Sequence, residues 1–356
     1  PIGGDDPGAA IVHLPPRRDP SRSDGRGDAE DGSLHLVARV AQVPERLAAW
    51  DRELWMVFSA EPAGPGKRQR RVLTMSIERG PLAGAWVPSP QGERLPTVAS
   101  LSGDGSLAGF VGTSRGPMAL IQQRADSTGR LRYQLLILLD GDWQGINLPE
   151  RWWEAPSAEA RSSGEGLRLE LVAAAEGPML VVIGERQGGV WRGRFAREAI
   201  KSGAEAAAAV SVEWAWSPLS FMSASGAAVP QAGSPVVASG GQLAFVGRLP
   251  SEGGLKLVNL TQSAARVLSP VIPGRDFGLV SLDQVGRVAL VWQESEVSPG
   301  DSNGQAIRRA APSLKTRITE LSAATGHILF EGPARVGGPV SSQELKLLAI
   351  ALVGVM

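Results

Sequence analysis

The side chains that most often perform acid–base chemistry or bind metal ions are sparse in this chain. It has three histidines, His13, His35 and His327, and no cysteine. Histidine is the commonest general base and metal ligand, and these three lie far apart in the sequence. The absence of cysteine excludes thiol nucleophiles, disulfides and cysteine-ligated metals. Serine-hydrolase, phosphate-loop, dinucleotide-binding and zinc-peptidase patterns are also missing. We therefore predict no catalytic residue, no cofactor and no metal site.

One pair of carboxylates stands beside an aromatic ring. The stretch LLDGDWQG places Asp140 and Asp142 on either side of a glycine and directly before Trp143. Alternate carboxylates of this kind can converge on a hard cation, and an indole can lie against a sugar ring. The simpler interpretation is a β-turn in which Asp140 accepts backbone amide hydrogens and Trp143 packs between sheets. We favour the turn and keep the three residues as candidates for an interaction.

Two adjacent tryptophans form a second candidate for an interaction. Trp152 and Trp153 lie in RWWEAP, after Pro149 and before a polar loop. Neighbouring residues of a strand point to opposite faces, so one indole would be exposed if this segment is extended. The alternative is that both rings are buried beneath the loop that follows.

The overall charge argues against a nucleic-acid partner. The 356 residues contain 36 basic and 36 acidic side chains, so the formal net charge is zero. A chain without net charge has no general field that attracts polyanions. We expect no nucleic-acid partner, and a protein or small ligand whose identity the sequence does not disclose.

The elements that would position these residues are short apolar phrases separated by Gly, Pro, Ser and Asp. Six of them align, at intervals of 45 to 72 residues, the shortest from Leu243 to Val288 and the longest from Leu107 to Met179. Short runs of this kind predict buried strands. The phrases are ELWMVFS, SLAGFVG, PMLVVIG, QLAFVG, RVALVWQ and ELKLLAIALVG, with first apolar residues Leu54, Leu107, Met179, Leu243, Val288 and Leu345.

The surroundings of the phrases predict four strands per repeat. A small-residue segment such as TVAS (97–100) or VVAS (236–239) comes before, and two further apolar segments follow. Four-stranded units at this spacing are typical of a β-propeller. We predict an all-β fold, a β-propeller of about six degenerate four-stranded blades. The alternative is a β-sandwich or two smaller β domains, because the intervals are irregular.

Three segments follow from this alignment. Residues 1–33 mix Pro, Gly and both charges with little apolar periodicity, and we expect a disordered lead. Residues 34–344 form the expected propeller domain. Residues 345–356 include the uncharged run LLAIALVGVM, which is either the closing strand or the start of a truncated transmembrane helix, since a full span needs about 20 residues.

The last twenty residues suggest a family. The stretch GGPVSSQELKLLAIALVGVM resembles the junction between an extracytoplasmic β-propeller-like region and the first helix of an RDD-type membrane domain in bacterial proteins. The resemblance implies that Leu34 to Met356 form the soluble part of a sensor or interaction module. It also implies an extracytoplasmic, membrane-associated location and a membrane tether through the C-terminal segment, with no catalytic residues.

Two functions are compatible with these observations. The first is a non-catalytic propeller for protein or ligand interaction, with a sensing role if a membrane domain is attached. The second is a propeller glycosidase or polysaccharide lyase whose carboxylates come from loops of several blades. Two carboxylates about 5 to 10 Å apart beside an exposed indole would favour the enzyme. A centre lined by small residues, as in TVAS and VVAS, would favour the interaction module.

Overall fold

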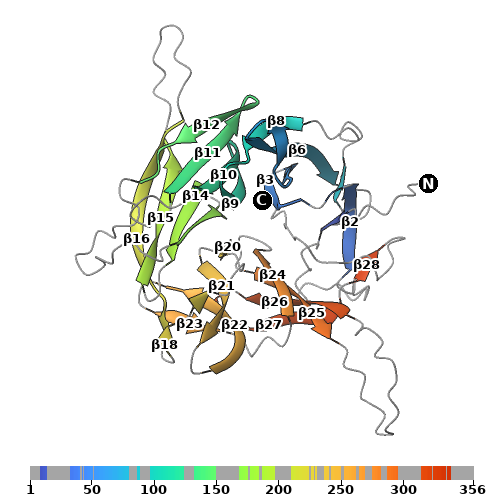
Figure 1. Ribbon diagram of the computed structural model, residues 1–356. Coiled ribbons are helices and arrows are strands. Elements are labelled where there is room, and N and C mark those ends of the chain that lie inside the picture. The colour runs from blue at the N-terminus through green and yellow to red at the C-terminus, as the bar shows by residue number, and fades with distance from the viewer. Residues whose placement is uncertain are drawn as a thin grey trace.

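The chain is built from β-strands in every part that the computed structural model describes (Figure 1). The described residues are 9–13, 33–40, 42, 44–50, 52–79, 86–88, 97–123, 132–149, 168–174, 177–183, 187–196, 210–223, 226–227, 229–230, 236–239, 242–249, 252–261, 264–268, 275–281, 287–295, 314–322, 324–333 and 335–337. Within these ranges no helix is long and apolar enough to serve as a membrane span.

Six sheets of three or more strands are arranged around a common centre (Figure 1). This confirms the predicted all-β propeller class, because two packed layers would be expected of a sandwich. We number the sheets I to VI along the chain. Sheet I contains β1 (Ala9–His13), β2 (Ser33–Val40) and β28 (Arg335–Gly337). Sheet II contains β3 (Arg46–Trp50), β4 (Glu53–Val57), β5 (Glu61–Gly64), β6 (Lys67–Arg79), β7 (Trp86–Pro88) and β8 (Thr97–Ser102).

The next four sheets follow the same order along the chain. Sheet III contains β9 (Ser106–Thr113), β10 (Gly116–Gln123), β11 (Arg132–Leu139) and β12 (Asp142–Ile146). Sheet IV contains β13 (Arg168–Ala174), β14 (Gly177–Ile183), β15 (Gln187–Phe195) and β16 (Val212–Ser220). Sheet V contains β19 (Val229–Pro230), β20 (Val237–Ser239), β21 (Gln242–Leu249), β22 (Glu252–Leu260) and β23 (Ala265–Val267). Sheet VI contains β24 (Arg275–Ser281), β25 (Arg287–Ser295), β26 (Leu314–Ser322) and β27 (Ile328–Pro333), and β17 (Met222–Ser223) pairs separately with β18 (Gly226–Ala227).

The first strands of neighbouring sheets contact one another near the centre. Strand β9 contacts both β3 and β13, and β20 contacts both β13 and β24. These five strands therefore form the inner ring, and the later strands of each sheet lie progressively further out (Figure 1). In each of sheets II to VI the chain passes outward from the inner strand through four antiparallel strands, so it returns to the same end before the next first strand. The orders are β3-β4-β6-β8, β9-β10-β11-β12, β13-β14-β15-β16, β20-β21-β22-β23 and β24-β25-β26-β27. The five inner strands consequently begin at one end of the ring.

The core lies between the sheets: clusters of buried side chains join sheets II and III, III and IV, IV and V, and V and VI. Every residue of β14 is buried, because one of its faces packs toward sheet III and the other toward sheet V. Phe245 of sheet V lies against Phe221 with ring centroids 6.0 Å apart and is fully buried. Burial on both faces explains why these strands are apolar almost without interruption.

One of the six phrases occupies a different place from the others. Leu54, Met179, Leu243 and Val288 lie in the second strands β4, β14, β21 and β25, whereas Leu107 lies in the innermost strand β9. The expectation that all the phrases are equivalent is wrong at Leu107. The phrase at Leu345 lies outside the described residues.

The same shift moves the segment TVAS away from the centre. It begins β8, which pairs with β6 in sheet II and not with β9. The expectation that TVAS lines the centre is therefore wrong, while Val237–Ser239 of VVAS forms the inner strand β20. The error arises because β9 is as apolar as a second strand, so pattern alone does not distinguish the two positions.

Glycines explain how β9 fits at the centre. A Cβ built on Gly109 would lie 2.7 Å from Cβ of Leu171 in β13, and one on Gly112 would meet the backbone oxygen of Ala49 in β3. Only a residue without a side chain allows both neighbours to approach this closely. The phrase that ends in GFVG is therefore adapted to the narrow inner ring.

Sheet I joins the two ends of the chain. Strand β2 pairs in antiparallel fashion with β1 and in parallel fashion with β28, with Leu34 opposite Val336. The expected disordered lead of residues 1–33 is thereby corrected at Ala9–His13 and at Ser33, because ladder hydrogen bonds to β2 and β28 compensate the entropy of ordering. The rest of the lead and the whole of 345–356 lie outside the described residues.

Candidate binding site at the inner ring

The predicted pair Asp140 and Asp142 belongs to a tight hairpin. Leu139 pairs with Asp142, so that Asp140 and Gly141 form a two-residue turn between β11 and β12. Their φ angles of 50° and 89° are both positive, as a type I′ hairpin turn requires. In the described part of the chain no group of three His, Asp or Glu side chains is placed to hold a metal ion. The geometry here is that of a structural turn.

The predicted tryptophans are placed differently from one another. Trp143 packs with Trp50 against the core cluster shared by sheets II and III, and its buried indole Nε1 has no hydrogen-bond partner among the described residues. Trp143 therefore fills space between blades. Trp152 and Trp153 lie outside the described residues, in the connection between β12 and β13 that leads to Arg168. Their role as interaction residues stays a prediction.

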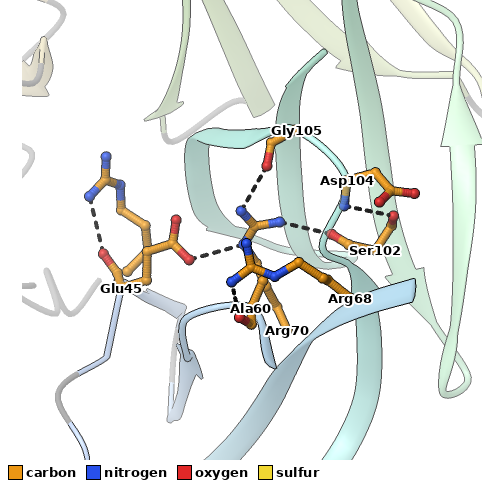
Figure 2. A network of polar contacts seen from close by, with 8 residues as sticks. Glu45, Ala60, Arg68, Arg70, Ser102, Asp104 and Gly105 are labelled. Atoms are coloured by element: carbon orange, nitrogen blue, oxygen red, sulfur yellow. Dashed lines mark hydrogen bonds and ion pairs between the residues drawn. The ribbon is translucent and has the colours of Figure 1, made fainter. Parts of the chain in front are cut away.

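A buried arginine ties sheet II to the turn that precedes β9 (Figure 2). Arg70 of β6 is 4% exposed, and its Nε lies 2.9 Å from Oε2 of Glu45. The two terminal nitrogens donate to the backbone oxygens of Ser102 and Gly105 at 2.9 and 3.0 Å. All three nitrogens of the guanidinium thus have an acceptor, which offsets the free-energy cost of burying its charge. The turn at Gly103, Asp104 and Gly105, directly before β9, is thus held by a side chain of sheet II.

Arg70 belongs to the basic run KRQRR (67–71) at the start of β6, and the other arginines of this run also make contacts within the protein. Arg68 donates to the backbone oxygen of Ala60 at 2.6 Å, as Figure 2 shows. Arg71 donates to Gln42 at 2.6 Å and lies 5.6 Å from the ring centroid of Phe58. The basic run therefore has a structural explanation that requires no anionic partner.

A second group of polar side chains lies at one end of the inner ring, and we call it the axial charge cluster. It consists of Arg46, Arg168 and Glu170 of the inner strands together with Tyr133 of β11. Oε1 of Glu170 is 2.7 Å from Nη2 of Arg168, two residues earlier on β13. Oε2 accepts a hydrogen bond of 2.9 Å from the backbone N–H of Val236, which immediately precedes β20. Glu170 thus links the inner strands of sheets IV and V.

Burial dominates the protonation of Glu170. Its side chain is 13% exposed, and desolvation raises its pKa above the ordinary value of 4.5. The positive charges of Arg168 and Arg46 and the hydrogen bond from Val236 oppose this effect without cancelling it. The carboxyl is therefore easier to protonate than an exposed glutamate.

Tyr133 extends the cluster toward sheet III. Its hydroxyl on β11 accepts a 3.2 Å hydrogen bond from the backbone N–H of Leu169. Burial raises the pKa of the phenol, the charge of Glu170 adds to this, and the hydrogen bond from Leu169 and the charge of Arg168 oppose it. The phenol therefore stays neutral in the ordinary range of pH.

The cluster is at the end of the ring where the inner strands begin. Arg46 is the first residue of β3 and Arg168 is the first of β13. Strand β24 begins there too, with Arg275 followed by Asp276. Three of the five inner strands therefore start with an arginine that has an acidic residue within two positions, Glu45, Glu170 or Asp276. Alternating charges at one end of a propeller form a place where a polar ligand can be held.

Sequence reasoning did not identify Glu170 or its partners. A weak signal is present in LRLELV, where two charges alternate with apolar residues inside an apolar run. Such alternation is also typical of an ordinary half-exposed strand. The contact with Val236 joins residues 66 positions apart, and only the assembled ring brings these residues together.

Solved structures that are similar to this chain at low identity include two crystal structures. The crystal structure of TolB from Acinetobacter baumannii is 12% identical with a TM-score of 0.41, over 94% of this chain and 65% of that chain. A crystal structure of the polysaccharide lyase Uly1 is 8% identical with a TM-score of 0.36, over 91% of this chain and 79% of that chain. The chain thus spans less than two thirds of the TolB chain. No protein-family model and no curated protein sequence matches it. The assignment of the propeller fold rests on the sheets themselves.

Proposed function

We propose that this chain is a non-catalytic propeller module that binds a protein or small ligand at the charged end of its inner ring. The observation that carries the proposal is the engagement of both oxygens of Glu170, one by Arg168 and one by the N–H of Val236. A carboxylate held by two donors in this way is suited to orient neighbouring groups, and it would have to leave Arg168 before it could exchange a proton with a substrate.

The remaining residues of the inner strands support the same interpretation. The described side chains of β3, β9 and β20 are mostly Ala, Leu, Val, Gly and Phe. The nearby carboxylate of Glu45 is bound to Arg70. A glycosidase needs two carboxyl groups that act independently across the scissile bond, and these two are each committed to an arginine.

A hydrolase or lyase is the second candidate function. The raised pKa of Glu170 favours it, because a carboxyl that binds its proton more tightly than an ordinary glutamate is better suited to act as a general acid. In that case Glu170 would donate the proton to the leaving oxygen, with the Tyr133 phenol close by. The substrate would be a polysaccharide, and the reaction would require Arg168 to release the carboxyl.

Attachment to a membrane forms part of the proposal. Its support is the resemblance of residues 337–356 to the junction with an RDD-type membrane domain, together with the uncharged run at 347–356. The proposed location is extracytoplasmic, with the C-terminal segment as the tether. Fractionation of cells that express the complete reading frame tests this, since recovery only in the soluble cytoplasmic fraction would contradict it.

The experiment that separates binding from catalysis uses one preparation of the chain. It is incubated with acidic and neutral polysaccharides while new reducing ends and unsaturated products are measured. We expect no turnover. Turnover that disappears in Glu170→Gln would overturn the proposal in favour of the enzyme.

A second experiment measures binding of the chain to immobilised peptides and oligosaccharides. We expect saturable binding to at least one of them that weakens in Arg46→Ala. Arg266→Ala is the matched control, because this exposed arginine lies on the outer strand β23. Equal losses in both variants would show that the inner ring is not the binding end.

A further inference from the structure

We propose that the axial charge cluster is an anion site, in which Arg46 and Arg168 bind a carboxylate or phosphate group of the ligand. This inference rests on the proposed binding function and specifies the chemistry of what is bound. The two arginines come from sheets II and IV, so the site exists only in the assembled ring.

Arg168 has hydrogen-bonding capacity that its described protein partners do not use. Its Nη2 faces Glu170, but its Nε is buried and donates to no acceptor in the described part of the chain. A buried donor without an acceptor is costly. The side chain as a whole is 34% exposed, although Nε and Nη2 are themselves enclosed by protein. An anion from solvent would therefore meet the remaining terminal nitrogen, Nη1, and its charge would compensate a guanidinium that Glu170 engages at Nη2 alone.

Arg46 stands at the start of the inner strand β3. This arginine is exposed, and Nη1 donates only to the backbone oxygen of the preceding Glu45, at 3.1 Å. Its charge acts on Glu170, and the inner strands β3 and β13 that carry the two residues both contact β9. Guanidinium groups are planar forks suited to carboxylate and phosphate oxygens. Arg46 therefore presents donors on the open side of the cluster.

The charges of the described arginines and glutamates at this end of the ring do not cancel. The described groups here are the guanidinium groups of Arg46, Arg70 and Arg168 and the carboxylates of Glu45 and Glu170. Arg70 and Glu45 neutralise each other, and Glu170 neutralises one of the two remaining arginines. One positive charge is left over, which favours an anion and disfavours a metal cation.

Glu170 is a positioning residue in this arrangement. Its carboxylate holds Nη2 of Arg168 and is itself fixed by the N–H of Val236. The guanidinium is thereby kept near the start of β13, where Arg46 can act on the same anion. Preorganisation of this kind improves affinity because less side-chain freedom is lost on binding.

The test is calorimetric titration of the full chain with inorganic phosphate and, separately, with succinate, at low ionic strength. We expect saturable binding of at least one of the two, and the tighter one identifies the chemical class. Arg46→Ala should weaken binding by about tenfold or more, the loss expected for one charge-assisted contact. Arg266→Ala, the control on β23, should leave it unchanged.

Arg168→Lys keeps the charge in case Arg168→Ala does not fold. We expect it to bind weakly as well, because lysine lacks the planar fork. Absence of saturable binding of either anion, or equal affinities of the wild type and Arg46→Ala, overturns the anion site. Saturable, arginine-dependent anion binding together with polysaccharide turnover upholds the site and overturns the non-catalytic function, so the two proposals fail separately.

Discussion

At the scale of single residues, Glu170 makes stability depend on pH. Its pKa is raised in the folded chain above the ordinary value of 4.5. The folded state therefore binds this proton more tightly than the unfolded state does. The contribution of Glu170 is fully present below pH 4.5 and is lost as the pH rises through the raised folded value.

We predict that Glu170→Gln abolishes this part of the pH dependence. The difference in unfolding free energy between the wild type and the variant should shift in favour of the wild type as pH is lowered from neutral toward 4.5. Urea denaturation of both proteins at several pH values measures it. The charges acting on Glu170 are those of Arg168 and Arg46, which stay constant over this range. A shift in the opposite direction would mean that the arginines outweigh burial.

Arg70 gives the second prediction at this scale. Arg70→Ala leaves the carboxylate of Glu45 and the backbone oxygens of Ser102 and Gly105 without their donor. We expect a loss of about 3 kcal/mol of unfolding free energy, as for other broken buried ion pairs. Arg68→Ala is the control, because this residue is exposed and makes one hydrogen bond to Ala60. Chemical denaturation should show a much smaller effect for the control.

At the scale of elements, the close approach of inner strands predicts the effect of a single methyl group. Gly109→Ala would place a Cβ 2.7 Å from that of Leu171 on the neighbouring strand. The two strands must separate, at an expected cost of about 1 to 3 kcal/mol. Gly145→Ala on the outer strand β12 is the control, since nothing lies within 4 Å of its added Cβ. Thermal unfolding of both variants compares them, and equal melting temperatures would contradict the close packing.

The elements also show what the sequence could and could not predict. Burial of each strand between two sheets leaves a continuous apolar run, and such runs located β4, β14, β21 and β25 correctly as equivalent second strands. The same property misplaced Leu107, because a strand on the inner ring is equally apolar. Gly109 and Gly112 of this strand allow the close approach of its neighbours in the narrow ring. Glycine in a strand also has other causes, so the sequence alone did not reveal this.

The candidate site was beyond the reach of sequence patterns for a different reason. Arg46, Arg168 and Glu170 are ordinary charged residues at strand ends when considered one at a time. Their relation depends on sheets II and IV, which are far apart in the sequence and whose inner strands β3 and β13 both contact β9 at the centre. The hairpin at Asp140, by contrast, is determined by a local Asp-Gly pair and was anticipated as a turn.

At the scale of the whole molecule, the parallel pairing of β2 with β28 connects the beginning of the chain to its end. We predict that removal of residues 1–40 lowers the denaturant midpoint and increases proteolysis, because sheet I loses two of its three strands. Removal of residues 1–8 leaves both strands intact and is the control. Identical unfolding curves for the two truncations would show that sheet I does not close the ring.

The even number of strands in the main path of sheets II to VI has a consequence for diversification. Each link from one sheet to the next, such as residues 150–167 ahead of Arg168, departs from and returns to the same rim of the ring. Substitutions and length changes in these links would alter what the rim recognises while leaving the hydrogen-bonded ladders intact. A scaffold of this kind can acquire new ligands by editing the four connectors that join sheets II to VI, without any change to its packed interior.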